Sequence, residues 1–209
     1  AIERDFSPFA AHVNGFLSLQ GRSEKGDDKM KDGQQTKSLA QMALGAALIA
    51  VCSWISIPTT VPFTMQTFGV CFVLLLLGGR KGTGSIGVYI LLGAVGLPVF
   101  SQFTGGLGVL FGNTGRYIVG FLLIGLITWA AERLGARKTW QKMVALLVGL
   151  VGLYLFGTVW FLWISTQGGS PVGFQAALGM CVLPFVPFDI AKFILAAVLC
   201  RRIRPHLSV

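Results

Sequence analysis

Charged side chains are scarce in this sequence of 209 residues: 12% of the residues are Asp, Glu, Lys or Arg, whereas 54% are hydrophobic. A soluble domain usually has about a quarter of its residues charged. The mean hydropathy of +0.72 also exceeds that of an ordinary soluble domain. The composition therefore excludes that class and predicts an integral membrane protein. The net charge of +9 does not indicate nucleic-acid binding, because the basic residues are dispersed over loop ends and a tail rather than gathered with aromatic residues.

Acids and cysteines are also few, which limits the chemistry that the chain can carry out. Six of the eight acidic residues precede residue 36. When Glu132 is assigned to a loop, Asp189 is the one acid left in a predicted span, whereas an enzyme of lipid or isoprenoid chemistry would need paired acids or a metal set. The four cysteines form no C-x-x-C pair, so we interpret them as small buried hydrophobic residues. We expect no catalytic residue, no metal and no cofactor.

Six apolar stretches are each close to the roughly 20 residues that cross a bilayer. Backbone groups in lipid must be hydrogen-bonded internally, so we expect helices rather than strands. The predicted fold is an all-α membrane protein whose six transmembrane helices cover residues 38–57, 63–79, 84–100, 115–131, 143–165 and 174–199. The 28 glycines favour close packing of these helices.

The charge of the connections alternates along the chain and predicts its orientation. The connections at residues 58–62, 101–113 and 166–173 carry no charged side chain. The other connections and the end of the last span are basic, through Arg80, Lys81, Arg133, Arg137, Lys138, Lys142, Arg201, Arg202 and Arg204. Short basic loops remain cytoplasmic. We therefore expect a multi-pass protein of the cell membrane with both termini in the cytoplasm and its basic ends near anionic headgroups.

Residues 1–35 differ in kind from the rest. They are polar and mixed in charge, and they lack the apolar region of a signal peptide. Met30 is followed by Lys31 and then by the first span, as at a native start, so we interpret the residues before Met30 as an upstream extension or as an added piece that is not native. A small regulatory helix at residues 6–19 is the alternative. The predicted membrane domain covers residues 36–205, and a short tail covers residues 206–209.

Three ionisable residues, Arg116, Asp189 and Lys192, lie inside or at the edge of apolar segments, where a charge is costly. Asp189 and Lys192 are three residues apart and share a helix face. Pro187 suits a first helical position, so the last helix is expected to begin there, with Asp189 in its first turn. A broken helix at this depth can hold a polar or anionic solute. The alternative is that the two charges only neutralise each other.

Arg116 lies on the uncharged, external side, where orientation alone does not require an arginine. It follows the glycine-rich residues 101–113, which could fold back as a lid that offers the amide of Gln102. The apolar lid residues would be Phe103, Leu107, Val109 and Phe111. Together with Asp189 and Lys192, Gln102 and Arg116 describe an outward-facing pocket for a small solute with a carboxylate, an apolar middle and amide-like groups. We expect Arg116 to lie near water, so that its loss spares the fold. Anchoring to lipid phosphate is the alternative for Arg116.

Several blocks occur in order along residues 36–205: VPFTMQT at 61–67, GLPVF at 96–100, GG at 105–106, GxTG at 112–115 and PxDxxK at 187–192. They resemble the BioY family, the biotin-specific S components of energy-coupling-factor (ECF) vitamin transporters. The resemblance implies a six-helix subunit of a bacterial-type inner membrane that binds biotin from outside. It also implies as partners a membrane coupling protein and two cytoplasmic ATPases, which would hydrolyse the ATP.

The resemblance implies biotin contacts at Gln102, Arg116, Asp189 and Lys192. Asp189 would accept hydrogen bonds from the ureido N–H groups. Either Arg116 or Lys192 could attract the valerate carboxylate, and the sequence does not choose between them. The apolar lid residues would cover the thiophane ring.

A further feature is an alanine pattern in the first span, Ala43-x-x-x-Ala47 and Ala46-x-x-x-Ala50, which resembles the motif by which these subunits dock on the coupling protein. Alanines four apart let another helix approach closely, but packing within the chain would use the same pattern. Two other functions stay open: a secondary transporter or channel working alone, and an S component for another small vitamin. A stand-alone transporter is disfavoured because no inverted repeat and no second intramembrane acid are evident.

Overall fold

The computed structural model describes residues 33–57, 63–112, 115–136, 138–167 and 173–204. The chain divides into two compact units, Ala1–Ala40 and Gln41–Val209. The first helix, Gly33–Trp54, begins in the first unit, and the elements that follow belong to the second. The predicted extension before Met30 lies outside the described residues, and the division at residue 36 stays a prediction.

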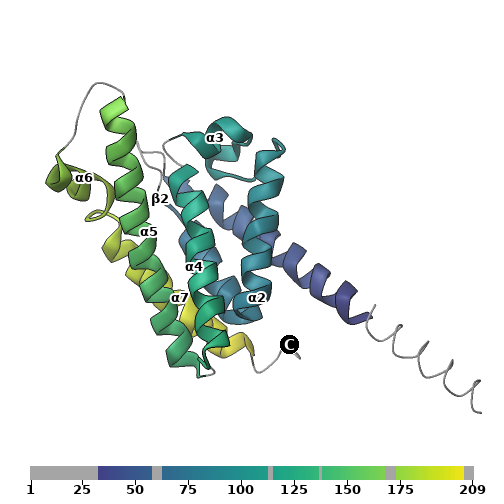
Figure 1. The fold of residues 1–209 in the computed structure, drawn as a ribbon. Coiled ribbons are helices and arrows are strands. Elements are labelled where there is room, and N and C mark those ends of the chain that lie inside the picture. Colours follow the sequence, from purple (N-terminus) through teal and green to yellow (C-terminus); the bar gives the residue numbers. More distant parts are fainter. Residues whose placement is uncertain (1–32, 58–62, 113–114, 137, 168–172, 205–209) are drawn as a thin grey trace, which may run out of the picture. The chain divides into compact units, whose positions relative to one another are not determined.

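After the first helix, the second unit consists of helices joined by short connections and one small strand pair (Figure 1). The strands are β1 (Ser56–Ile57) and β2 (Phe63–Thr64), which pair antiparallel. The helices are α2 (Gln66–Ala94), the 3-10 turn η1 (Ser101–Phe103), α3 (Leu107–Phe111), α4 (Gly115–Arg133), α5 (Thr139–Gln167), α6 (Phe174–Cys181) and α7 (Val186–Ile203). The second unit is mainly helical, as predicted, and the short strand pair departs from the all-α prediction.

The element labelled α2 consists of two helical segments that meet at Gly78, where the sequence predicts two helices joined by a basic loop. The chain bends at Gly78, which has φ +81° and ψ 169°, and continues at once as helix through Arg80 and Lys81. Glycine adopts this conformation without the steric cost that a Cβ imposes. Two helices are therefore present as predicted, but their connection lies at Gly78, and Arg80 and Lys81 belong to the second segment.

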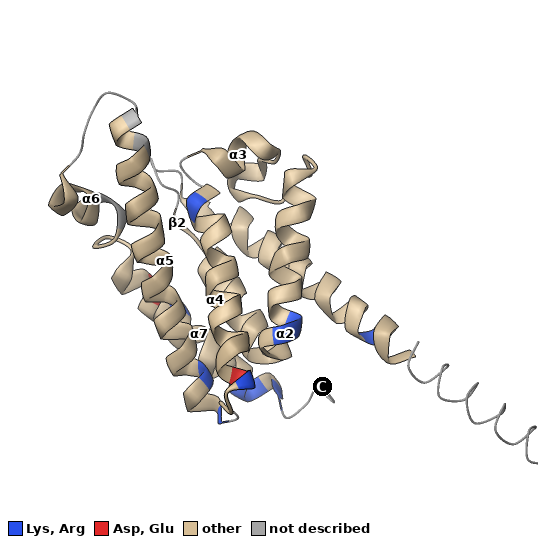
Figure 2. Cartoon of the chain, viewed as in Figure 1, with Lys and Arg blue, Asp and Glu red and all other residues tan. Residues whose placement is uncertain are grey.

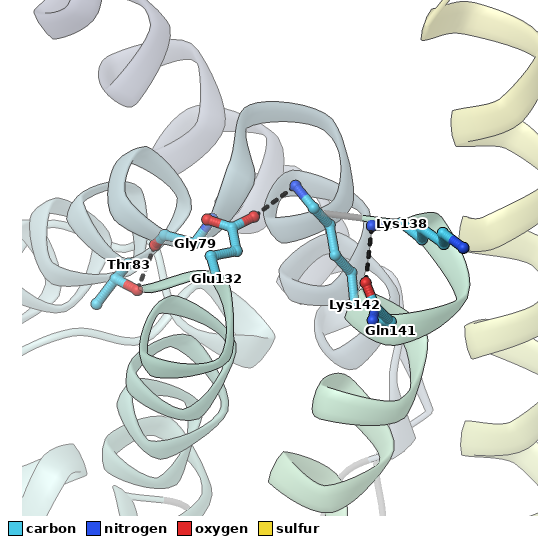
Figure 3. A network of polar contacts seen from close by, with 6 residues as sticks. All are labelled: Gly79, Thr83, Glu132, Lys138, Gln141 and Lys142. Carbon is cyan, nitrogen blue, oxygen red and sulfur yellow. Dashed lines mark hydrogen bonds and ion pairs between the residues drawn. The ribbon is translucent and has the colours of Figure 1, made fainter. Parts of the chain in front are cut away.

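The bend in α2 is held by Glu132 in the last turn of α4 (Figure 3). Its Oε2 accepts a hydrogen bond from the Gly79 backbone N–H at 2.7 Å, which satisfies one of the N–H groups left open where a helix restarts. The other oxygen, Oε1, lies 2.6 Å from the Lys142 ammonium near the start of α5. One carboxylate thus ties α2, α4 and α5 together at this end.

Most basic segments gather at this same end of the second unit, where α4 ends and α5 begins (Figure 2). The sequence predicts that these segments share one side of the membrane, and their arrangement agrees with it. Among the described residues, three helices are long and apolar enough to cross a bilayer: Gly33–Trp54, Gly115–Arg133 and Thr139–Trp163. The count of six spans and the cytoplasmic position of the termini stay predictions.

The last predicted span is broken, as Pro184 and Pro187 within it indicate. Helix α6 ends at Cys181, residues 182–185 form turns, and α7 begins at Val186 with Pro187 in its first turn. Asp189 follows in the same turn, and its backbone N–H donates to the Phe185 carbonyl at 2.9 Å. The break thus places an acidic side chain at the start of a helix that packs on α2.

The core of the second unit lies where α2, α4, α5 and α7 meet. Small residues allow close approach: a Cβ on Gly149 of α5 would lie 2.9 Å from the Ile124 Cα of α4. The cysteines whose side chains are described, Cys52, Cys71 and Cys200, are buried and free, as expected for small core residues.

Candidate ligand-binding site

Asp189 is the centre of a buried polar cluster formed by α5 and α7. It is 4% exposed, and both of its carboxylate oxygens are hydrogen-bonded. The Tyr154 hydroxyl of α5 donates to Oδ2 at 2.6 Å, and the Lys192 ammonium lies 2.9 Å from Oδ1. A buried ion pair is tolerated when further hydrogen bonds satisfy its remaining lone pairs, and Tyr154 provides one here. The predicted common face of Asp189 and Lys192 is confirmed.

A small cavity of about 40 Å³ opens beside this cluster. It is lined by residues of β2, α2, α4, α5 and α7 and of the turn before α7, namely Thr64, Gln66, Thr67, Tyr117, Phe121, Leu153, Tyr154, Phe185, Asp189 and Lys192. Such a volume has room for a few water molecules. The small cavity can therefore receive a polar group, but not a whole vitamin.

A larger cavity of about 490 Å³ adjoins the small one, because Thr64 and Lys192 line both. Its other lining residues come from β1, β2, α7 and the residues next to the two strands: Ile55, Ser56, Ile57, Phe63, Met65 and Phe188. The volume lies within the range of small-molecule sites, and apolar walls with few polar anchors are typical of them. The small cavity is thus a polar recess, and the larger cavity is an apolar chamber beside it.

Gln66, in the first turn of α2, adds a second buried polar group to the small cavity. It is 3% exposed, and its Nε2 donates to the Tyr89 hydroxyl at 2.8 Å. Tyr89 is itself buried and meets the ring of Phe100 edge-on at 5.5 Å. The amide is thus held by a partner farther along the same bent helix.

The sequence interpretation missed Tyr154 and Gln66, because tertiary packing alone brings them to Asp189. One signal in the sequence could have pointed to the tyrosines. The chain has three tyrosines among 54% hydrophobic residues. Two of them, Tyr117 and Tyr154, line the small cavity, and Tyr89 holds Gln66. A phenol in a membrane span needs a partner for its hydroxyl, which makes a rare tyrosine informative.

Arg116 is fully buried at 0% exposed, so the expectation that it lies near water is wrong. Its guanidinium lies 5.2 Å from the centre of the Tyr117 ring and 4.9 Å from that of Phe161. Aromatic faces attract a cation, which allows the charge to be buried in the first turn of α4. Burial also argues against anchoring to lipid phosphate. Arg116 lines neither cavity, although its neighbour Tyr117 lines the small one.

The predicted lid segment forms η1 and α3. Gln102 and Phe103 are exposed, with φ values of +57° and +56°, and the Phe103 ring stacks on Trp54 at 5.0 Å. Leu107 and Phe111 are also exposed, whereas Val109 is half-buried and packs on the core. None of these side chains lines the two cavities beside Asp189. Their role as lid and as contact stays a prediction.

The four alanines of the first helix fall on two faces. Ala46 and Ala50 are buried in the core, whereas Ala43 and Ala47 are exposed. Packing within the chain, the alternative left open by the sequence, therefore accounts for Ala46 and Ala50. The docking prediction is left with Ala43 and Ala47. Within the described ranges, no group of three His, Cys, Asp or Glu side chains could hold a metal ion.

Comparison with known proteins decides the family, since the BioY family model matches residues 25–209. The chain belongs to the BioY family. It is 37% identical over 169 residues to the biotin transporter BioY of Thermotoga maritima, which covers 80% of this chain and 96% of that protein. It is 40% identical over 169 residues to the biotin transporter BioY2 of Lactococcus lactis subsp. cremoris, over 79% of this chain and 90% of that one.

The fold is also similar to a solved crystal structure described as the S-component for biotin from an ECF-type ABC transporter. The TM-score is 0.70 at 28% identity, and the match covers 83% of this chain and 93% of the solved one. These BioY relatives are transporters, so the prediction that the chain is a membrane transport protein and not an enzyme is confirmed.

Proposed function

We propose that this BioY protein binds biotin and serves as the S component of an ECF-type transporter for biotin uptake. Family membership and the names of the relatives support the substrate. The observation that carries the proposal is the hydrogen-bonded cluster of Asp189, Lys192 and Tyr154 at the junction of a polar recess and an apolar chamber. Biotin matches these two cavities, because its compact polar ureido group is fused to an apolar ring that carries an aliphatic chain.

The ureido group fits the small cavity by its pattern of donors and acceptors. A urea carries an N–H beside its carbonyl oxygen, and the cluster places an acceptor beside a donor, with 2.9 Å between Asp189 Oδ1 and Lys192 Nζ. Asp189 would accept from a ureido N–H, and Lys192 would donate to the ureido carbonyl. Charged partners strengthen both hydrogen bonds. This geometry favours the ureido oxygen, rather than the carboxylate, as the partner of Lys192.

The thiophane ring and the valerate chain would occupy the larger cavity, against Phe63, Met65 and Phe188. Burial of apolar surface contributes roughly 25 cal/mol per Å². Gln102 and Arg116 line neither cavity, so they would meet the ligand only after η1 or the first turn of α4 moves. We propose them as contacts of such a rearranged state and not of the geometry described above.

Transport would depend on other subunits. The exposed Ala43 and Ala47 present a smooth helix face to a membrane coupling protein, and two cytoplasmic ATPases would supply the energy. In this proposal the chain is a multi-pass protein of the bacterial cell membrane with both termini in the cytoplasm, as its basic connections indicate.

Uptake of labelled biotin by cells that produce this chain with and without the coupling protein and ATPases tests the proposal. We expect uptake with the complete module and little above background without it. Full uptake by the chain alone would favour a stand-alone transporter. Labelled thiamin and riboflavin serve as competitors, and suppression of uptake by either one would reassign the substrate.

A further inference from the structure

Gln66 is the buried polar group of the small cavity to which neither the sequence nor the family comparison assigns a role. It is 3% exposed and comes from α2, whereas Asp189 and Lys192 come from α7. A buried amide needs hydrogen-bond partners for both of its ends. The question is which end of this amide is satisfied within the protein and which end remains for a ligand.

The N–H end is satisfied by Tyr89, whose hydroxyl accepts from Gln66 Nε2 at 2.8 Å. The oxygen of a phenol has lone pairs and can accept a hydrogen bond from the amide. Among the described residues, no donor lies on the Gln66 carbonyl oxygen, although the side chain lines the cavity. The carbonyl is thus the end offered to a ligand.

We propose that Gln66 is a specificity-determining contact that accepts a hydrogen bond from the second ureido N–H of biotin. The inference rests on the proposed function, because it assigns a contact within the same site. A cyclic urea has two N–H donors, and the cavity wall then presents two acceptors, the Asp189 carboxylate and the Gln66 carbonyl. Tyr89 is a positioning residue that keeps the carbonyl turned toward the cavity.

The hydrogen bond to the Gln66 carbonyl should make the site bind a cyclic urea more tightly than a ring in which oxygen replaces one N–H. An ether oxygen in that place would face the Gln66 carbonyl, acceptor against acceptor, and would leave a buried polar group without its partner. A site built to hydrogen-bond a substrate group discriminates strongly against the analogue that lacks it. The two cyclic carbamate analogues of biotin, each with one ureido N–H replaced by oxygen, are therefore the probes.

Binding of biotin and of both carbamates is measured by isothermal titration with the full chain and with Gln66→Leu. We expect the unchanged protein to bind each carbamate at least about tenfold more weakly than biotin. Gln66→Leu should bind biotin about tenfold more weakly. It should no longer prefer biotin to one carbamate isomer, but it should still prefer biotin to the other isomer. A variant that keeps both preferences in full would overturn the assignment.

Two further variants keep the test decisive. Tyr89→Phe leaves Gln66 in place but removes its hydrogen-bond partner, so the preference for biotin over that carbamate isomer should fall in part. If this preference is not reduced, Tyr89 does not position Gln66, and this result holds even if Gln66→Leu fails to fold. The matched control is Gln41→Leu on the first helix, where Gln41 accepts from Lys81 at 2.7 Å and lines neither cavity. It should alter neither affinity nor preference. If the unchanged protein does not bind biotin at all, the proposed function fails and not this assignment.

Discussion

At the scale of single residues, Asp189 shows how a membrane protein keeps a charge where ions are poorly solvated. Its two oxygens have separate partners, the Lys192 ammonium and the Tyr154 hydroxyl. Neutralisation by Lys192 lowers the cost of burial, and Tyr154 orients the carboxylate before a ligand arrives. Such preorganisation is what a selective polar recess requires.

The Asp189–Lys192 pair gives a prediction that separates structure from binding. Asp189→Asn alone leaves the Lys192 ammonium buried without its partner and should lower the free energy of unfolding by about 3–5 kcal/mol. The double variant Asp189→Asn with Lys192→Gln should recover most of that stability. It should still bind biotin at least about tenfold more weakly, because charge-assisted contacts are lost. Thermal unfolding in detergent and titration of the same samples measure both effects; recovered stability with unchanged affinity would make the pair purely structural.

Tyr154→Phe removes one buried hydrogen bond to Asp189 and leaves the shape of the side chain unchanged. We expect a loss of about 1–2 kcal/mol in stability and a severalfold loss of biotin affinity, because the carboxylate is no longer held. Thr128→Val is the control, since it removes a buried hydroxyl that donates to the Ile124 carbonyl and lines neither cavity. Equal effects of both variants on biotin affinity would show that Tyr154 has no special role at the site.

Some residues of the site could be predicted from the sequence, and others could not. Asp189 and Lys192 could be predicted as neighbours, because three residues along a helix determine which face they share. Gln66 and Tyr154 could not, since distant helices bring them to the site. The exposure of Arg116 was mispredicted because its position on the uncharged side suggested water. The aromatic rings that bury it are a property of the packed bundle.

At the scale of elements, two breaks in the helices shape the molecule. The break at residues 182–185 could be predicted, because prolines end helices by local sterics. The position of the connection at Gly78 could not, because the charges of Arg80 and Lys81 placed the connection at those residues. Strands β1 and β2, with two residues each, are too short for an alternating pattern to reveal them. Together, the break and the strand pair position the residues that line the larger cavity.

The bend in α2 should depend on glycine at residue 78. Alanine there would have to adopt φ +81° and ψ 169°, a region in which strain costs about 1–3 kcal/mol. We expect Gly78→Ala to lower the free energy of unfolding by that amount. Gly87→Ala in the same helix is the control, because a Cβ there meets nothing within 4 Å and should be neutral or slightly stabilising. Equal stability of the two variants would show that the bend tolerates a side chain.

The first helix gives a prediction about docking. Ala43→Trp and Ala47→Trp change exposed positions, so both variants should fold and bind biotin normally. An indole on that face should hold a partner helix away and reduce co-purification of the coupling protein. Ala46→Trp is the contrasting variant, because overpacking at a buried position should destabilise the chain itself. Undiminished co-purification with both exposed variants would place the docking surface elsewhere.

At the scale of the whole molecule, most basic segments lie in a different part of the second unit from the cavities. Most basic segments gather where α4 ends and α5 begins, around Glu132 and Lys142 (Figures 2 and 3). The cavities lie instead beside the strand pair and the starts of α2 and α7. In the proposed function, the ligand would bind at one side of the membrane and the ATPases would act at the other.

The two adjoining cavities are proposed to form one biotin site, and titration of the purified chain is the direct test of this proposal. Isothermal titration with biotin, thiamin and riboflavin, each against the unchanged protein, compares the three ligands under one set of conditions. We predict that each chain binds one biotin and that thiamin and riboflavin bind much more weakly or not at all. Tighter binding of thiamin or riboflavin, or no binding of biotin by folded protein, would contradict it.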